Sequence, residues 1–209
     1  DKSLERLGFR KLLTRTETLS PYGKTKLKKL KNYLKGEEQL LEEEFIKMEV
    51  FINFSEENKN LIRDIEGIIH RLKDIKAVIN NCLKENILDD IDLFEIKVQA
   101  LLMEELNLLL KKLPEELKNF DLESMEEMID ALDPDKDRLP TFYVYDSYSP
   151  ALKMVRNKKK DVEKKIFAAK SFEEVSQLKE ERLEILVEEE REELEVRRQL
   201  TYILLKKAE

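Results

Sequence analysis

Residues that turn or interrupt a helix are scarce in this chain. Its 209 residues include only 4 glycines and 5 prolines. Because glycine and proline most often end helices and form turns, the chain has few places to reverse direction. We therefore expect a mainly α fold, arranged as an elongated bundle of long helices.

Charged residues make up 41% of the chain, and hydrophobic residues make up another 41%. An ordinary domain carries about 25% charged residues, so we expect charged helix faces that meet water on several sides. The hydrophobic share is too high for a disordered composition. The net charge of −7 argues against a stand-alone nucleic-acid binder, because such proteins are usually basic.

The single cysteine, Cys82, excludes a disulfide within the chain, and we expect a buried thiol. No apolar run reaches the roughly 20 residues of a membrane span. The N-terminal sequence DKSLERLGF lacks the apolar segment of a signal peptide. We expect a cytoplasmic protein without membrane contact. The absence of an initiator methionine suggests a processed chain or an excised fragment.

Apolar periodicity and capping residues predict eight helices. Two of them begin at a Ser-Pro pair, Ser20-Pro21 and Ser149-Pro150, which places a capping serine before a proline at the first helical position. Ser55 is expected to cap the long helix that ends near Glu85. In the last helix the register weakens at 183–187, which allows a short extended break. The predicted helices span residues 3–16, 20–35, 37–54, 55–85, 92–112, 121–132, 150–170 and 171 to the C-terminus.

The segment Asp133–Arg156 departs from this helical pattern. Four aromatic residues lie within seven positions, with prolines and aspartates around them; they are Phe142, Tyr143, Tyr145 and Tyr148. This composition predicts a short aromatic β element near 141–145. Three regions follow along the chain: a helical core domain at 1–132, a loop and strand insert at 133–149, and two helices of opposite charge at 150–209.

Those last two helices differ sharply in charge. Residues 153–170 contain eight basic and two acidic residues, a net charge of +6, whereas residues 173–195 contain eleven acidic and three basic ones, a net charge of −8. The helices either pair antiparallel or each present a solvated face. The candidate contacts to DNA phosphates are Lys153, Arg156, Lys158, Lys159 and Lys160. Because the whole chain is acidic, pairing between the two helices is favoured over DNA contact.

Residues able to support catalysis are few. His70 is the only histidine, so a histidine-based metal site or catalytic dyad has one possible member, and we expect a boundary residue. No GxxxxGK[ST] or GxGxxG sequence is present. Asp133, Asp135 and Asp137 alternate as in a calcium loop but lack its glycine and terminal glutamate, which favours turn formation. We expect no enzyme activity, catalytic residue, metal site or cofactor in this chain.

The segment Asp133–Arg156 resembles the core region of MutS-family proteins, especially their archaeal and second bacterial branches. Those branches carry a pattern LD-x(n)-D-S-x-S-x-x-L-x-x-x-R between core helices. Its residues here are Leu132, Asp133, Asp146, Ser147, Ser149, Leu152 and Arg156. The FYVY sequence just ahead looks like the archaeal version of that region.

Two further segments are similar to the same family. LGFRKLLTRTETLSPYGKTKLKKL looks like the start of the core, with Ser20 where the family often has threonine, and RLEILVEEEREELEVRRQL looks like the approach to its lever helices. The resemblance implies a core and lever region of a DNA repair or recombination protein. In that family a homodimer binds DNA, and a separate domain hydrolyses ATP with Mg²⁺. The ATPase and a β-rich clamp are missing from this sequence.

The resemblance also suggests a structural motif formed by Asp133, Tyr145, Asp146, Ser149 and Pro150. We expect Phe142, Tyr143 and Tyr145 to pack against core helices, and Asp146 or Ser149 to cap the next helix. The region at 150–209 would then be the lever, which relays the ATPase state to the parts that hold DNA. The alternative is a free-standing helical module that binds a protein partner.

Overall fold

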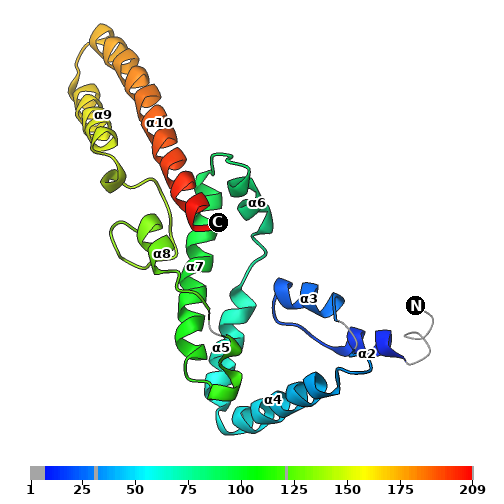
Figure 1. The fold of residues 1–209 in the computed structure, drawn as a ribbon. Helices are drawn as coiled ribbons and strands as arrows, with labels where there is room; N and C mark the ends of the chain where they lie inside the picture. Colours follow the sequence, from blue (N-terminus) through cyan, green and yellow to red (C-terminus); the bar gives the residue numbers. More distant parts are fainter. Residues whose placement is uncertain (1–7, 31–32, 121, 209) are drawn as a thin grey trace. The chain divides into compact units, whose positions relative to one another are not determined.

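The computed structural model describes residues 8–30, 33–120 and 122–208 (Figure 1). Nine α-helices and two short 3₁₀ helices are found in these ranges, and the described residues contain no β-strand. The predicted mainly α fold is confirmed. None of the helices in the described ranges is long and apolar enough to cross a membrane.

The chain forms two compact units that are interleaved in sequence. Unit 1 contains Asp1–Asp74 and Leu102–Met125, and unit 2 contains Ile75–Leu101 and Glu126–Glu209. Residues 75–101 and 126–132 therefore cluster with the two C-terminal helices, although they lie within the predicted core region 1–132. Helix α7, Asp90–Leu110, begins in unit 2 and ends in unit 1.

Unit 1 consists of short and medium helices. They are α2 (Phe9–Arg15), α3 (Pro21–Lys28), α4 (Glu38–Glu57), α5 (Lys59–Arg71), the end of α7 and the 3₁₀ helix η1 (Glu115–Phe120). Ser20 caps α3 as predicted, because Gly23 N donates to Ser20 Oγ at 3.1 Å. The buried apolar residues of this unit include Ile65 and Ile68 on α5 and Leu102 and Leu106 on α7.

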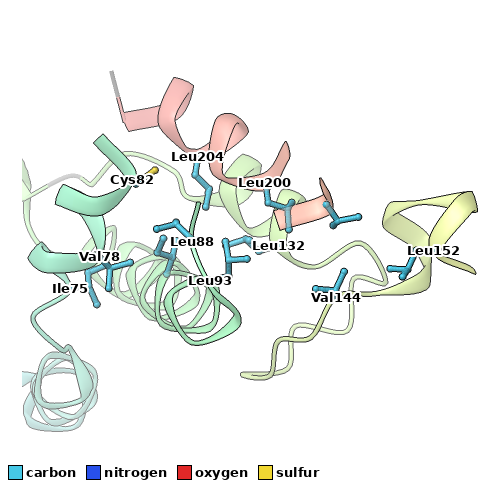
Figure 2. Close-up of a cluster of buried hydrophobic side chains, with 12 residues drawn as sticks. Ile75, Val78, Cys82, Leu88, Leu93, Leu132, Val144, Leu152, Leu200 and Leu204 are labelled. Atoms are coloured by element: carbon cyan, nitrogen blue, oxygen red, sulfur yellow. The ribbon is translucent and has the colours of Figure 1, made fainter. Parts of the chain in front are cut away.

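Unit 2 holds the larger core. Its helices are α6 (Lys76–Leu83), the start of α7, α8 (Glu126–Leu132), η2 (Asp146–Tyr148), α9 (Pro150–Ala168) and α10 (Phe172–Ala208). Figure 2 shows buried side chains from α6, α7, α8, α9 and α10 and from the connections between them. The buried members are Ile75, Val78, Cys82, Leu88, Leu93, Ile96, Leu132, Val144, Leu152, Val196, Leu200 and Leu204.

Helices α9 and α10 lie side by side as an antiparallel pair (Figure 1). A second apolar cluster joins them, formed by Val155, Val162 and Ile185. With 37 residues, α10 is about 55 Å long at 1.5 Å per residue. The extended break allowed at 183–187 is absent. The apolar spacing of α10 is irregular at these positions because Leu183 and Val187 face solvent while Ile185 packs against α9.

The predicted helix 55–85 is wrong in its extent. Ser55 is not its cap: the hydroxyl of Ser55 donates to Ile52 O at 2.7 Å inside α4, which continues to Glu57. A second interruption separates α5 from α6, and both Leu72 and Ile75 in this connection are buried. The boundary between the two units falls here, between Asp74 and Ile75, and apolar periodicity does not mark such a boundary.

The predicted β element near 141–145 is also absent. The backbone there is not part of any strand among the described residues. A strand needs a paired neighbour, but the carbonyl of Val144 accepts a hydrogen bond from Arg156 Nη1 at 2.7 Å instead. The aromatic side chains are therefore positioned by the core and by ring contacts without a sheet.

Replacing Leu93 by alanine should destabilise unit 2 strongly. Leu93 has no exposed surface and lies in the central cluster, so Leu93→Ala should lower the free energy of unfolding by about 2–5 kcal/mol. Urea denaturation followed by circular dichroism measures this. Leu183→Ala is the matched control, because it makes the same change at an exposed helical position, and it should cost less than about 0.5 kcal/mol. Equal losses would contradict the assigned core.

Candidate functional site

The segment Asp133–Arg156, which we call the junction segment, connects α8 to α9 within unit 2. Three of the residues in and beside it belong to the core: Leu132, Val144 and Leu152 (Figure 2). The segment is thus held by the same apolar cluster as α6, α7 and α10. Its polar residues form two networks. One joins Asp133 and Tyr145 to Lys97, and the other surrounds Arg156.

The first network is a buried ion pair. Lys97 Nζ on α7 donates to Asp133 Oδ1 at 2.9 Å and to the Tyr145 hydroxyl at 3.3 Å. The side chains of Lys97 and Asp133 are 0% and 1% exposed. The second oxygen of Asp133 accepts the backbone N–H of Arg138 at 2.8 Å. Each charge therefore has several partners, which a buried ion pair needs to offset desolvation.

Burial and pairing act in opposite directions on these groups. Burial favours the neutral forms, but hydrogen bonding to Asp133 and Tyr145 raises the pKa of Lys97 above its ordinary value. Burial likewise opposes ionisation of Asp133, but the hydrogen bond from Lys97 holds its pKa below the ordinary value. We infer that both groups are charged at neutral pH, and that the pair is a fixed structural element.

The acidic loop after α8 is organised by its own carboxylates. Asp137 Oδ1 accepts the backbone N–H of Leu139 at 2.9 Å, and Asp135 Oδ1 accepts the Ser147 hydroxyl at 3.3 Å. The turn interpretation of this aspartate cluster agrees with these contacts. Among the described residues, no group of three or more His, Cys, Asp or Glu side chains is arranged to hold a metal ion.

The aromatic residues surround Tyr145, which is 2% exposed. Phe142 and Tyr148 meet its ring edge-on, at 6.3 and 5.7 Å between ring centroids. Tyr143 lies 4.0 Å from the same ring, but 55% of its surface is exposed. The expectation of core packing therefore holds for Phe142 and Tyr145, while Tyr143 covers Tyr145 on the outside.

Helix α9 begins as its sequence predicts. Leu152 N donates to Ser149 Oγ at 3.3 Å, and Pro150 occupies the first helical turn. Of the two predicted caps, Ser149 is the one that acts. Asp146 instead binds Arg156, two turns into α9, through a 2.5 Å contact with its Nη1.

Arg156 is the centre of the second network. Its Nη1 also binds the Val144 carbonyl, its Nε donates to Glu189 Oε1 at 3.1 Å, and its Nη2 donates to Glu193 Oε1 at 2.7 Å. Burial acts against the charge, but the carboxylates of Asp146, Glu193 and Glu189 raise the pKa of Arg156. One guanidinium thus ties the junction segment to both α9 and α10.

Further ion pairs join the two long helices. Lys159 binds Glu189, Lys158 lies 3.8 Å from Glu188, and Arg182 lies 2.9 Å from Glu163. Burial tends to raise the pKa of Glu189, but hydrogen bonds from Lys159 and Arg156 lower it. Of the two arrangements left open by the sequence, the structure adopts the antiparallel pair.

This pairing separates the five candidate DNA contacts into two groups. Arg156, Lys158 and Lys159 face acidic residues of α10. Lys153 and Lys160 are exposed, and neither forms an ion pair with a residue in the described ranges. Of the five candidates, Lys153 and Lys160 are the two without an acidic partner among the described residues, so the predicted basic surface is smaller than its sequence suggested.

A shallow pocket of about 660 Å³ lies over the junction segment. Three of its polar side chains already have partners: Asp135 binds Ser147, Asp146 binds Arg156, and Tyr145 binds Lys97. The residues that line it are Asp135, Tyr143, Tyr145, Asp146, Ser147, Pro150 and Lys153. This arrangement offers no activated nucleophile or acid–base pair.

The two reactive side chains singled out in the sequence lie elsewhere. His70 is exposed on α5. Cys82 is buried in the core of unit 2, where its thiol donates to Thr201 O at 3.7 Å and burial raises its pKa. The buried thiol expected from the sequence is confirmed.

Sequence reasoning missed Lys97, the residue on which the first network depends. A signal was present, because Lys97 occupies a core position in the apolar stripe of α7 formed with Leu93, Ile96 and Ala100. A lysine at such a position requires a buried anionic partner. Asp133 lies 36 residues away, so helical periodicity could not identify it.

Comparisons of this chain with protein-family models, curated proteins and solved structures find no match.

Replacing Asp133 by asparagine should destabilise the protein by about 3 kcal/mol at pH 7, because the buried Lys97 loses its counterion. The pKa of Asp133 is lowered by folding, so its contribution is present above the unfolded pKa of about 4 and is lost as the pH falls through the folded pKa. Urea denaturation of both proteins from pH 7 to pH 2 should show the difference shrinking below about pH 4. A constant difference would contradict the paired state.

Replacing Arg156 by methionine should loosen the attachment of α9 and α10 to the junction segment. The change leaves Glu189 without one of its two basic partners, and we expect a loss of about 3 kcal/mol in the free energy of unfolding. Lys164→Met is the control, since Lys164 forms an exposed pair with Asp161, and it should cost less than about 0.5 kcal/mol. If both variants lost a similar free energy of unfolding, the Arg156 network would not stabilise the attachment of α9 and α10.

Proposed function

We propose that this chain is the core and lever region of a MutS-type DNA repair or recombination protein. In this role it relays the state of an ATPase domain to the parts of the protein that hold DNA. The supporting observation is that the residues of one pattern that carries the resemblance, from Leu132 to Arg156, converge on the segment that connects α8 to the two long helices of unit 2.

Each residue of that pattern has a defined contact. Leu132 and Leu152 are fully buried in the core, Asp133 holds Lys97, and Ser149 caps α9. The two remaining charged residues, Asp146 and Arg156, bind each other. Such a pattern is expected of a structural junction, because each of these residues supports the connection and none is left for catalysis.

The α9–α10 pair has the properties of a lever. It is held along its length by apolar contacts and ion pairs, and at its base by Arg156. Packed helices move as rigid bodies between discrete arrangements. A displacement at the base would therefore reach the connection between Ala168 and Phe172 without being absorbed by bending.

The proposal assigns ATP, Mg²⁺ and hydrolysis to a different domain of the parent protein. DNA binding and homodimer formation belong to that parent as well. Taken alone, the chain should bind DNA weakly at most, because Arg156, Lys158 and Lys159 are matched to acidic partners. No catalytic step is assigned to residues of this chain.

The alternative function, a free-standing module for protein–protein interaction, is favoured by one observation. Helix α4 of unit 1 exposes several large apolar side chains and buries none of its residues. That surface is compatible with both functions, because a lever protein can also bind partners.

The lever function can be tested in the natural full-length protein by measuring spin-label distances. Phe167 is 95% exposed near the end of α9, so Phe167→Cys provides a label on each subunit of the expected dimer. The distance between the two labels should change by several ångströms when a non-hydrolysable ATP analogue binds, as expected for rigid-body motion.

The matched control places two labels within one lever, using Lys160→Cys and Leu194→Cys in a subunit diluted with unlabelled protein. That distance should stay constant, because both sites lie on the α9–α10 pair. The proposal fails if the natural gene encodes no GxxxxGK[ST] sequence. It fails equally if nucleotide leaves the distance between subunits unchanged, or changes the distance within one lever.

A further inference from the structure

Helix α4 carries large apolar side chains that remain exposed to solvent. Six of them are between 43% and 59% exposed, and none of the 20 residues of the helix is buried. They are Leu40, Phe45, Ile46, Met48, Phe51 and Ile52. So many exposed apolar groups on one helix indicate a surface that another molecule covers.

Three of these residues share one face of the helix with Leu41, which is half-buried. Leu41, Phe45, Met48 and Ile52 follow one another at spacings of four, three and four, which places them in a single stripe. We call this set the α4 stripe. Val50 and Phe54 point to the opposite side and are half-buried, and α4 contacts α5 and η1. The helix is therefore attached to unit 1 by one side and leaves Phe45, Met48 and Ile52 of the α4 stripe exposed.

The charges beside the stripe are acidic. Glu42 and Glu49 follow one edge, and neither forms an ion pair with another residue of the described ranges. Glu44 lies at the other edge and has only an exposed contact with Lys47, at 3.2 Å. In paired helices, residues at these edge positions face the edge residues of the other helix. Their charges therefore determine which helix binds.

These glutamates disfavour a second copy of the chain as the partner. In a parallel pair of α4 helices, Glu44 of one copy would face Glu49 of the other. In an antiparallel pair, Glu42 would face Glu49. Both arrangements place like charges together at an interface, which selects against that pairing.

We propose that the α4 stripe binds an amphipathic helix of a partner protein whose apolar stripe is flanked by lysine or arginine. The apolar residues of the two helices would interdigitate, and the basic residues of the partner would meet Glu42, Glu44 and Glu49. Amphipathic helices are commonly recognised in this way, through apolar side chains that recur every three or four residues. The inference does not depend on the lever function, because all its residues lie in unit 1.

Binding to synthetic peptides tests the proposal with the intact chain. The probe is a peptide of about three heptads with isoleucine and leucine in its stripe and lysine at the flanks. One control peptide has glutamate at the flanks, and another keeps lysine but has alanine in the stripe. Fluorescence anisotropy should show the probe binding at least about ten-fold more tightly than either control.

Variants of the chain locate the surface. Phe45→Ser with Met48→Ser should weaken probe binding at least about ten-fold, while circular dichroism stays unchanged because both side chains are exposed. Ile46→Ser is the matched control on another side of α4 and should bind normally. Glu42→Lys with Glu49→Lys should invert the preference between lysine- and glutamate-flanked peptides. Glu43→Lys with Glu57→Lys makes the same charge change away from the stripe and should not invert it.

Several results would overturn the proposal. The probe could fail to bind, or both flanking charges could bind equally well. Sedimentation could show a dimer that Phe45→Ser with Met48→Ser dissociates, which would make a second copy the occupant. A cysteine introduced as Met48→Cys could also resist thiol labelling in the monomer, which would mean that the chain itself covers the stripe.

Discussion

An ammonium group with no exposed surface can remain inside a protein only when its charge and its hydrogen bonds are matched. Lys97 meets this condition through Asp133 and Tyr145, which lie 36 and 48 residues further along the chain. The pair therefore fixes the end of α8 and the aromatic residues against α7. Because a lone charge at this depth would cost several kcal/mol, the remaining contacts of the junction segment depend on this arrangement.

The Arg156 network extends that fixed point to the long helices. Its guanidinium contacts the Val144 carbonyl one residue before Tyr145, and it reaches Glu189 and Glu193 on α10. Both networks are thus joined through adjacent residues of one extended segment. An extended strand there would need a neighbouring strand for its backbone, whereas Arg156 satisfies one of its carbonyls directly. The junction segment is best explained as a connection between the core and the α9–α10 pair.

The sequence predicted the features that depend on neighbouring residues. The caps at Ser20 and Ser149 follow from a serine that precedes a proline, and the charge difference after residue 150 indicated a possible helix pair. Features that depend on residues far apart in the sequence were either not predicted or predicted wrongly. The interruption between α5 and α6 lies at the boundary between the two units, which periodicity does not mark, and the partner of Lys97 lies too far away in sequence. The aromatic segment was interpreted as a strand because its composition is typical of one, although no neighbouring strand exists among the described residues.

The central claim is that the junction segment joins α7 and α9 into one cooperative structure. Native-state hydrogen exchange tests this most directly, because it reports the free energy of opening for each amide. The amides of Val155–Lys159 in α9 and of Leu93–Lys97 in α7 should exchange with the same opening free energy, and Arg156→Met should lower that of α9 more than that of α7. If α9 exchanges independently of α7 in the unmodified protein, the junction does not connect them and the account is wrong.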